Sequence, residues 1–309
     1  MLAEGLVARG VDVTLFATLD SLTTAKLDGV CDRGYAEDPT RDGRVWEALH
    51  VAYALERSGD FDLVHNHLDW LPLAFSSLCR APMVTTIHGF SGSAILPAYE
   101  VANSAYVSIS DADRSPALHY SATVYHGIDL DGLPYSAQGG DDLVILGRIH
   151  SDKGTAAAID IARRSGRRLR IAGIVQDEAY FREEVEPHID GDRVEYLGSV
   201  GPAQRADLLG SAVALLHPIS FAEPFGLSVV EAMAAGTPVI AYRKGSMPEL
   251  IADGVTGFLV TDASAVAAAV DLAATLDRHR IRRVAERRFS ASRMVEDYLA
   301  VYADLIRPR

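Results

Sequence analysis

Short apolar runs alternate with stretches of helical spacing along the first part of the chain. The runs predict buried strands over residues 11–17, 61–67, 81–89, 105–110 and 122–129. Helical patterns lie between several of these runs, for example over residues 43–58, and residues 2–10 have the pattern of a helix that ends at a glycine. Strands that alternate with helices indicate a parallel sheet, so this part is expected to form an α/β domain.

The alternation is interrupted and then restarts. Residues 129–142 are rich in glycine, proline and aspartate, which is typical of a linker. Further strands are predicted over residues 142–147, 168–173, 193–198, 212–218, 237–242 and 256–260. Residues 262–306 are expected to be helical. The pattern predicts two doubly wound, Rossmann-like α/β domains, residues 1–137 and residues 138–290.

Composition narrows the class of protein. The 309 residues, 49% of them hydrophobic, are enough for two domains with real cores. A net charge of −13 disfavours a general nucleic-acid binder, because neutralising phosphates requires a basic surface. The two cysteines, Cys31 and Cys79, lack a zinc-site spacing and fit a reducing compartment. With no apolar run of membrane-spanning length and no signal pattern in MLAEGLVARG, we expect a cytoplasmic protein.

Residues able to do chemistry follow the predicted strands. His65 and His67 follow FDLV, His88 follows VTTI, Arg148 follows VILG, and Glu223 follows ALLHPIS. Ligands of open parallel sheets bind beyond the carboxyl ends of the strands. If the strand ends of the two sheets face each other, these residues are expected to line a cleft between the domains.

The segment EPFGL is suited to an anionic ligand. It predicts the start of a helix, where Pro224 fits the first turn and Gly226 lets the backbone approach a phosphate closely. Arg148 and Lys153, in GRIHSDKG, can supply the cations that a diphosphate needs.

Two acids flank this helix start. Glu223 and Glu231 are eight positions apart, a distance of roughly 12 Å if the whole segment is helical. Carboxylates accept hydrogen bonds from hydroxyl groups, so the pair can serve two sugar ends of one extended ligand. The plainer interpretation is a pair of solvated helix acids.

Three segments then resemble one family. FAEPFGLSVVEAMAAGTPVIAY, GRIHSDKG and GSMPELIADGVTGFLV are similar to the retaining GT-B glycosyltransferases of family 4. The similarity covers most of residues 142–306 and is weaker over residues 1–136. It implies a GT-B fold with residues 291–309 packing back on the N-terminal domain. It also implies transfer of a hexose from a UDP- or GDP-sugar to a sugar, lipid-linked or small-molecule acceptor, with no metal and no other cofactor.

The resemblance assigns roles to individual residues. The catalytic set it implies is Arg148 and Lys153 at the diphosphate, Glu223 beside the donor hexose, and His88 near the transferred sugar. The substrate-binding set it implies is Glu231 at the ribose, together with Phe225, Gly226, Leu227, Gly147 and Gly198, with the stretch Leu197–Val200 beside the base.

Other chemistries fit these residues less well. The order Lys-Gly-Thr at 153–155 is not that of a phosphate loop, and no G-x-G-x-x-G motif follows a strand. His65 and His67 have the spacing of a metal pair but no third ligand follows, so structural or acceptor-side roles are favoured. The arginine-rich residues 163–170 and 278–288 are interpreted as solvated faces, or alternatively as sites of peripheral contact with anionic lipid.

The start of the chain departs from the family pattern. The family begins with a strand and a glycine-rich loop, whereas this chain begins inside the helix at residues 2–10. We expect the chain to be a piece of a longer protein and, as given, weakened or inactive, because the strands beside a missing central strand would be unpaired. The alternative function is a non-catalytic remnant that binds a nucleotide sugar. A nucleotide-sugar epimerase is disfavoured by the pair of glutamates.

Overall fold

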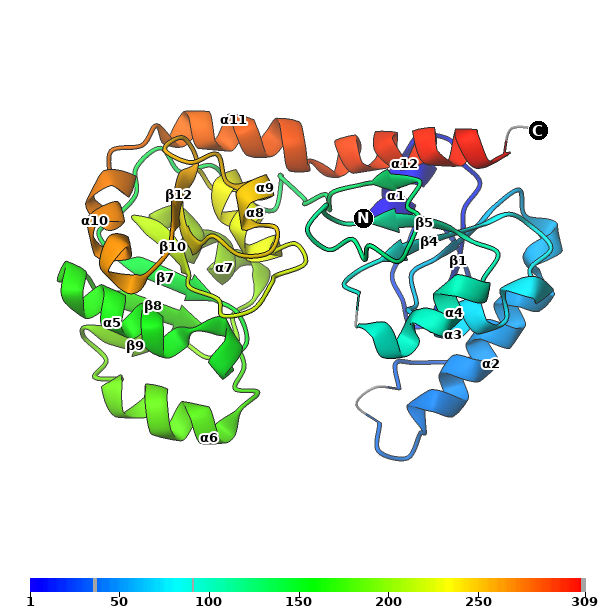
Figure 1. The fold of residues 1–309 in the computed structure, drawn as a ribbon, viewed down its shortest axis with the longest axis horizontal. Coiled ribbons are helices and arrows are strands. Elements are labelled where there is room, and N and C mark those ends of the chain that lie inside the picture. Colours follow the sequence, from blue (N-terminus) through cyan, green and yellow to red (C-terminus); the bar gives the residue numbers. More distant parts are fainter. Residues whose placement is uncertain (36–37, 91, 307–309) are drawn as a thin grey trace. The chain divides into compact units, whose positions relative to one another are not determined.

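The computed structural model describes residues 1–35, 38–90 and 92–306. The chain forms two compact units, Met1–Gly127 with Ala291–Arg309 and Ile128–Ser290 (Figure 1). The C-terminal end of the segment predicted to pack on the first domain, residues 307–309, lies outside the described residues.

The first unit contains short helices and parallel strands. Its elements are α1 (Leu2–Ala8), β1 (Thr14–Phe16), β2 (Lys26–Asp28), α2 (Gly43–Glu56), β3 (Val64–Asn66), α3 (Leu71–Ala74), β4 (Met83–Ile87), α4 (Leu96–Val101), β5 (Ala105–Ser108), β6 (Ala122–Thr123) and α12 (Ala291–Ile306). Strands β3, β4, β5 and β6 form one parallel sheet in that order, and β1 pairs with β2 in a separate two-stranded parallel sheet.

Helix α12 belongs to the first unit although it is distant in sequence. It lies beside α1 (Figure 1). Val295 of α12 packs in one buried cluster with Leu6 of α1 and with Val84 and Val107 of the sheet. At Gly5 of α1, an added Cβ would lie 2.4 Å from a methyl group of Val295, so a glycine is needed for this close packing. The C-terminal helix therefore completes the core of the first unit.

The second unit is a doubly wound α/β sheet with all strands parallel. Its elements are β7 (Leu143–Leu146), α5 (Thr155–Ser165), β8 (Leu169–Ala172), α6 (Glu178–Tyr180), β9 (Val194–Tyr196), α7 (Pro202–Ser211), β10 (Ala214–His217), α8 (Leu227–Ala234), β11 (Val239–Tyr242), α9 (Met247–Leu250), β12 (Gly257–Val260), α10 (Ala263–Ala273) and α11 (Arg278–Phe289). The six strands are ordered β12-β11-β10-β7-β8-β9.

The order of the strands creates a switch point between β7 and β10. From β7 the chain proceeds outward to β8 and β9, and after returning to β10 it proceeds the other way, to β11 and β12. The loops that leave β7 and β10 therefore diverge onto opposite faces, with α5 packing beside α10 and α8 beside α11 (Figure 1). In such sheets a switch point is where a ligand has room to bind.

Residues 128–137 pack with the second unit, whereas the sequence pattern placed them in the first domain. The Ile128 amide donates to the Phe289 carbonyl at 2.8 Å, and the Ser136 amide donates to the Ala235 carbonyl at 3.1 Å. The hydrophobic pattern does not reveal these bonds, because they are made by the backbone.

The arginines of residues 278–288 were interpreted as a solvated face, and for three of them this interpretation is wrong. Arg278 donates to the carbonyls of Ser136, Gly210 and Ala212, and burial lowers its pKa. Arg282 and Arg288 also donate to backbone carbonyls of this unit. These side chains tie the linker and helix ends to the core, because a carbonyl that ends a helix needs a donor from elsewhere.

The helices differ from membrane-spanning segments in length and composition. Over residues 1–35, 38–90 and 92–306, none is both long enough and apolar enough to cross a bilayer.

Candidate functional site

Three of the four predicted catalytic residues meet at the switch point of the second unit. Arg148 and Lys153 lie in the loop between β7 and α5, and Glu223 lies in the loop between β10 and α8. Lys153 Nζ is 2.5 Å from Glu223 Oε2 although the two residues are 70 positions apart. The parallel sheet brings the two loops together by placing β7 beside β10.

The loop after β7 is built for close approach to the loop after β10. The Ser220 amide donates to the Asp152 carbonyl at 2.9 Å. Gly154 has φ +75°, and a Cβ at this position would lie 2.1 Å from the Pro218 carbonyl oxygen. A side chain at Gly154 would force the two loops apart and move Lys153 away from Glu223.

The loop after β10 turns into α8 through a glycine. Gly226 has φ +96°, which favours glycine, and helix α8 begins at the next residue, Leu227. Ser246 holds this turn in place: its amide donates to the Glu223 carbonyl at 3.0 Å, and its hydroxyl donates to the Phe225 carbonyl at 2.6 Å. The position of Glu223 is therefore set by a neighbouring loop as well as by its own.

Lys153 and Glu223 form a largely buried ion pair. Their side chains are 18% and 14% exposed, and Lys153 Nζ lies 4.6 Å from the centre of the Phe221 ring. Burial alone would raise the pKa of Glu223, but His217 and Lys153 together outweigh burial and lower that pKa below its ordinary value. Glu223 is therefore a carboxylate at neutral pH.

Arg148 is engaged with side chains of its own neighbourhood. Its guanidinium donates to Asp152 Oδ2 at 2.7 Å and to Gln176 Oε1 at 2.8 Å. Arg148 and Lys153 nevertheless line the same small cavity. Two cations and two carboxylates thus share one small region at the ends of β7 and β10.

His217 was not predicted, yet it lies inside this group. It is the last residue of β10 and is 4% exposed, and its Nε2 atom is 3.7 Å from Glu223 Oε2, too far for a hydrogen bond. This buried Nε2 has no hydrogen-bond partner among the described residues. A small cavity beside the ring is lined by Gly147, Arg148 and Lys153. The rule that predicted Glu223 looks for a polar residue after a strand, and it does not detect His217 because His217 is part of β10 itself.

Glu231 has a different environment from that of Glu223. It lies on α8 and is 17% exposed, with its carboxylate 3.1 Å from a guanidinium nitrogen of Arg205 on α7. Burial raises the pKa of Glu231, and Arg205 opposes that rise without cancelling it. The predicted helical spacing between the two acids was wrong in part, because the helix begins only at Leu227 and Glu223 lies in the loop before it.

The predicted donor-contact residues lie along the same edge of the sheet. Phe225 is 3% exposed with its ring packed edge-on against Phe289, whereas Leu227 is 48% exposed. Gly147 follows β7 and Gly198 follows β9. Gly173 lies between these two glycines, and its amide donates to the Gly198 carbonyl at 2.8 Å. The carboxyl ends of three adjacent strands therefore carry glycine-rich backbone, which a ligand can approach closely.

His88, the fourth predicted catalytic residue, lies in the first unit. Its Nε2 atom is 3.0 Å from Nδ1 of His67, and its ring stacks on that of His126 with centroids 5.2 Å apart. His65 has a structural role, since its ring nitrogens are hydrogen-bonded to Tyr302 of α12 at 2.6 Å and to Thr86 at 2.8 Å. Within the described part of the chain, no group of three or more His, Cys, Asp or Glu side chains is placed to hold a metal ion.

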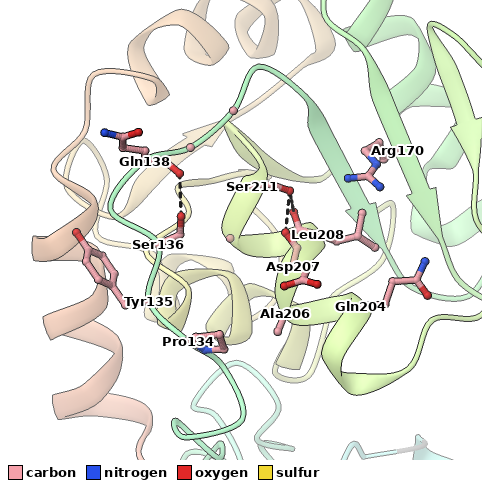
Figure 2. Close-up of a pocket in the computed structure, with 13 residues that line it drawn as sticks. Pro134, Tyr135, Ser136, Gln138, Arg170, Gln204, Ala206, Asp207, Leu208 and Ser211 are labelled. Atoms are coloured by element: carbon pink, nitrogen blue, oxygen red, sulfur yellow. Dashed lines mark hydrogen bonds between the residues drawn. The ribbon is translucent and has the colours of Figure 1, made fainter.

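A second hollow of this unit lies elsewhere. It has a volume of about 630 Å³ and is bounded by the segment 134–140 and by α7, with Arg170 at one side (Figure 2). Gly140 and Ser211 in its wall precede β7 and β10, so it lies at the amino ends of these strands. It contains none of the predicted site residues.

Comparison with known proteins identifies the family of the chain. The family model for glycosyl transferases group 1 matches residues 136–288, and the model for glycosyltransferase family 4 matches residues 1–131. A D-inositol 3-phosphate glycosyltransferase of Streptomyces scabiei is 30% identical over 334 residues, covering 84% of this chain and 73% of that protein. The chain belongs to the group 1 glycosyltransferase family. A glycogen synthase of Mycobacterium tuberculosis is 29% identical over 87% of this chain and 79% of its own length.

Solved structures show the same fold. AviGT4, a glycosyltransferase involved in avilamycin A biosynthesis, superposes with a TM-score of 0.75 at 25% identity, covering 99% of this chain and 88% of its own. HepE of Anabaena, solved in complex with UDP-glucose, superposes with a TM-score of 0.69 at 20% identity, covering 90% of this chain and 86% of its own. The predicted GT-B fold class is confirmed.

Proposed function

We propose that this family member is a retaining glycosyltransferase that transfers a hexose from a UDP- or GDP-sugar to a hydroxyl-bearing acceptor. The observation that carries the proposal is the meeting of Arg148, Lys153 and Glu223 at the switch point between β7 and β10. A nucleotide diphosphate sugar needs cations at its phosphates and hydrogen-bond acceptors at its hydroxyl groups, and this region offers both.

In this proposal, Arg148 and Lys153 stabilise the diphosphate as it leaves. Charge that develops on a leaving group is stabilised best by donors that are already in position, and this effect is among the largest in catalysis. Both side chains are held near the carboxyl end of β7 by short contacts, so little rearrangement is needed to reach a phosphate. Because two protein cations supply the compensating charge, the proposed reaction uses no metal ion and no other cofactor.

Glu223 and Glu231 would bind the two sugar portions of the donor. Glu223 is ionised at neutral pH and would accept hydroxyl hydrogens of the hexose. Glu231, in the middle of α8, would accept those of the ribose, and the backbone of Phe225, Gly226 and Leu227 would follow the diphosphate. Gly147 and Gly198 would let the donor approach the sheet edge, and His88 of the first unit would act on the transferred sugar.

The proposal includes three classes of acceptor. A sugar, a lipid-linked sugar or a small polyol each offers a hydroxyl that can attack the anomeric carbon on the face from which the diphosphate departs. Attack from that face retains the anomeric configuration. The expected location of the enzyme is the cytoplasm, where nucleotide sugars would be available.

The test combines donor binding with transfer. Calorimetric titration with UDP-glucose and GDP-mannose should show binding of one donor, and that donor, labelled in its sugar, should pass label to a member of a mixed pool of polyols and oligosaccharides. The NMR coupling constant of the new anomeric proton should match that of the donor. Binding without transfer would favour the non-catalytic alternative, and an inverted product would exclude the retaining mechanism.

A further inference from the structure

We propose that His67 fixes the tautomer of His88, so that His88 carries its proton on Nε2 and presents Nδ1 as a hydrogen-bond acceptor to a hydroxyl group of the transferred sugar. The inference rests on the proposed function, which puts His88 beside that sugar. It makes His67 a positioning residue, because His67 would act on the sugar only through His88.

The fold brings the two histidines together. His67 directly follows β3, and His88 directly follows β4. These strands are parallel neighbours with Asn66 in register with Thr85, so the residues that follow them emerge at the same edge of the sheet. The Leu68 amide donates to Asn66 Oδ1 at 2.9 Å, which holds the turn that carries His67. The position of His67 is therefore set by strand pairing and by this turn.

The contact between the two rings couples their tautomers. Nδ1 of His67 is 3.0 Å from Nε2 of His88, which is a hydrogen-bond distance. Both rings are neutral at neutral pH, because loss of hydration, followed by the charges of His88 and His126, lowers the pKa of His67 to about 3, and loss of hydration lowers the pKa of His88. A neutral imidazole has one N–H donor and one acceptor nitrogen. One of the two facing nitrogens must therefore donate and the other must accept.

Two arrangements satisfy this contact. In the first, the Nε2–H group of His88 donates to Nδ1 of His67, and both rings carry their proton on Nε2. In the second, both rings carry it on Nδ1. The first is favoured, because a free neutral histidine side chain prefers its proton on Nε2, away from the substituted ring carbon. It leaves Nδ1 of His88 as an acceptor, to which a sugar hydroxyl can donate its hydrogen.

A neighbouring histidine shows what distinguishes His88. Both ring nitrogens of His65 are hydrogen-bonded, to the hydroxyl groups of Tyr302 at 2.6 Å and Thr86 at 2.8 Å, so neither nitrogen is left for a ligand. Among the residues that the structure describes, only His67 is hydrogen-bonded to the ring of His88. His88 is also exposed to solvent, so a substrate can reach it.

The plane of the His88 ring is held as well. The ring of His126 stacks on it with centroids 5.2 Å apart and planes 8° apart. Arg293 of α12 donates to the Tyr125 carbonyl at 2.6 Å and so anchors the segment that carries His126. With the ring plane restrained by stacking, the tautomer decides whether His88 offers the sugar an acceptor or a donor.

The first measurement is the tautomer itself. With the whole chain isotope-labelled in its histidine nitrogens, long-range proton–nitrogen NMR spectra at about pH 7.5 distinguish protonated from unprotonated ring nitrogens. The signals of His88 are assigned by their absence in His88→Asn. In the wild type, His88 should carry its proton on Nε2. In His67→Ala, the two tautomers of His88 should mix, because the acceptor for its Nε2–H group is gone.

The second measurement is sugar transfer from UDP-glucose or GDP-mannose, whichever the chain uses. His67→Ala should lower kcat by about tenfold, the loss of roughly one hydrogen bond, with little change in the KM for the donor. His67→Asn should restore kcat to within about twofold of wild type, because its side-chain oxygen lies near the place of Nδ1 and can accept the same hydrogen bond. His67→Gln is the matched variant, since its amide lies one methylene farther out, and it should behave as His67→Ala.

The control is His119→Ala, which removes an exposed histidine of the same unit and should keep the wild-type spectrum and rate. A purely structural role of His67 would not move the tautomer of His88, nor would it favour asparagine over glutamine at this position. The spectra and the pair of amide variants therefore separate positioning from folding.

A proton on Nδ1 of His88 in the wild type would overturn the inference, as would an unchanged tautomer in His67→Ala or equal losses of kcat in His67→Asn and His67→Ala. If His67→Ala fails to fold, as judged by circular dichroism, the wild-type spectrum and the comparison of His67→Asn with His67→Gln decide. Absence of transfer by the wild type would instead contradict the proposed function, while the spectra would still decide whether His67 sets the tautomer of His88.

Discussion

Glu223 and Glu231 occupy two regions only a loop and a helical turn apart, yet their surroundings shift their pKa values in opposite directions. The two side chains are similarly buried, at 14% and 17% exposed. Glu223 has a lysine at 2.5 Å and a histidine beside it, and its pKa is lowered, whereas Glu231 has one guanidinium at 3.1 Å, and its pKa is raised. The number and the distance of the charged partners, more than burial, therefore decide in which direction the pKa of each carboxylate is shifted.

This contrast bears on function. A carboxylate that stays ionised accepts hydroxyl hydrogens without exchanging a proton, which suits contact with the reacting hexose. A carboxylate whose ionisation is less favoured is stabilised more when a ligand supplies hydrogen-bond donors. This suits a binding contact such as that with the ribose hydroxyls. The following predictions test whether Glu223 contacts the reacting hexose and Glu231 contacts the ribose.

Replacing Lys153 is expected to have the largest effect. Lys153→Ala removes a diphosphate cation and leaves Glu223 without its closest partner, so donor turnover should fall by about 10²–10³-fold. Initial rates of nucleotide release measure the loss. Lys26→Ala, a change in β2 of the first unit, is the control and should keep the wild-type rate. A fall of less than about threefold in Lys153→Ala would remove this lysine from the mechanism.

Replacing Arg148 should slow transfer with less effect on donor affinity. Arg148→Ala removes the second cation but leaves the ion pair of Lys153 and Glu223 intact, so kcat should fall by roughly 10²-fold. Arg164→Ala breaks an exposed pair with Asp160 on α5 and serves as the matched control. Equal kinetics for the two variants would contradict the role given to Arg148.

Replacing Glu231 should weaken binding more than catalysis. Glu231→Ala removes the acceptor proposed for the ribose, so the Kd for the nucleotide alone should rise by about tenfold, a loss typical of one hydrogen bond to a charged group. Calorimetry with UDP or GDP measures this. If kcat falls while Kd stays constant, the assignments of Glu223 and Glu231 should be exchanged.

The pH dependence of the free energy of unfolding distinguishes the two carboxylates without any substrate. The lowered pKa of Glu223 adds stability that is present above the pKa of the unfolded chain and is lost as the pH falls through the folded value. The raised pKa of Glu231 has the opposite sign and costs stability as the pH rises past the unfolded value. The free energy of unfolding of Glu223→Gln, taken relative to wild type, should therefore be lower at neutral pH than in acid. That of Glu231→Gln, also relative to wild type, should be higher at neutral pH than in acid. Urea unfolding at both pH values measures this, and parallel curves would contradict it.

Much of the second unit could be predicted from sequence. All six of its strands lie inside predicted apolar runs, because a parallel strand covered on both faces reads as a continuous hydrophobic segment. Strand β2 of the first unit was not predicted, since its three residues, KLD, carry no apolar pattern. The anchoring of the linker by Arg278 and Arg282 was also missed, because a hydrogen bond to a distant carbonyl leaves no periodicity in the sequence.

The site was predictable in part for the same reason. Polar residues after strands pointed to Arg148 and Glu223, and strand order brings them together. The direct pairing of Lys153 with Glu223 depends on a glycine and a carbonyl that let two loops touch, which only the structure shows. His217 was overlooked because it precedes a proline in an otherwise apolar strand and so reads as part of the core.

The most direct test of the central claim is a crystal structure of the chain with UDP bound. The account predicts a diphosphate within hydrogen-bond distance of Arg148 and Lys153, at the carboxyl ends of β7 and β10, with the ribose at Glu231. A diphosphate bound elsewhere, for example in the hollow at the amino ends of these strands, would contradict it.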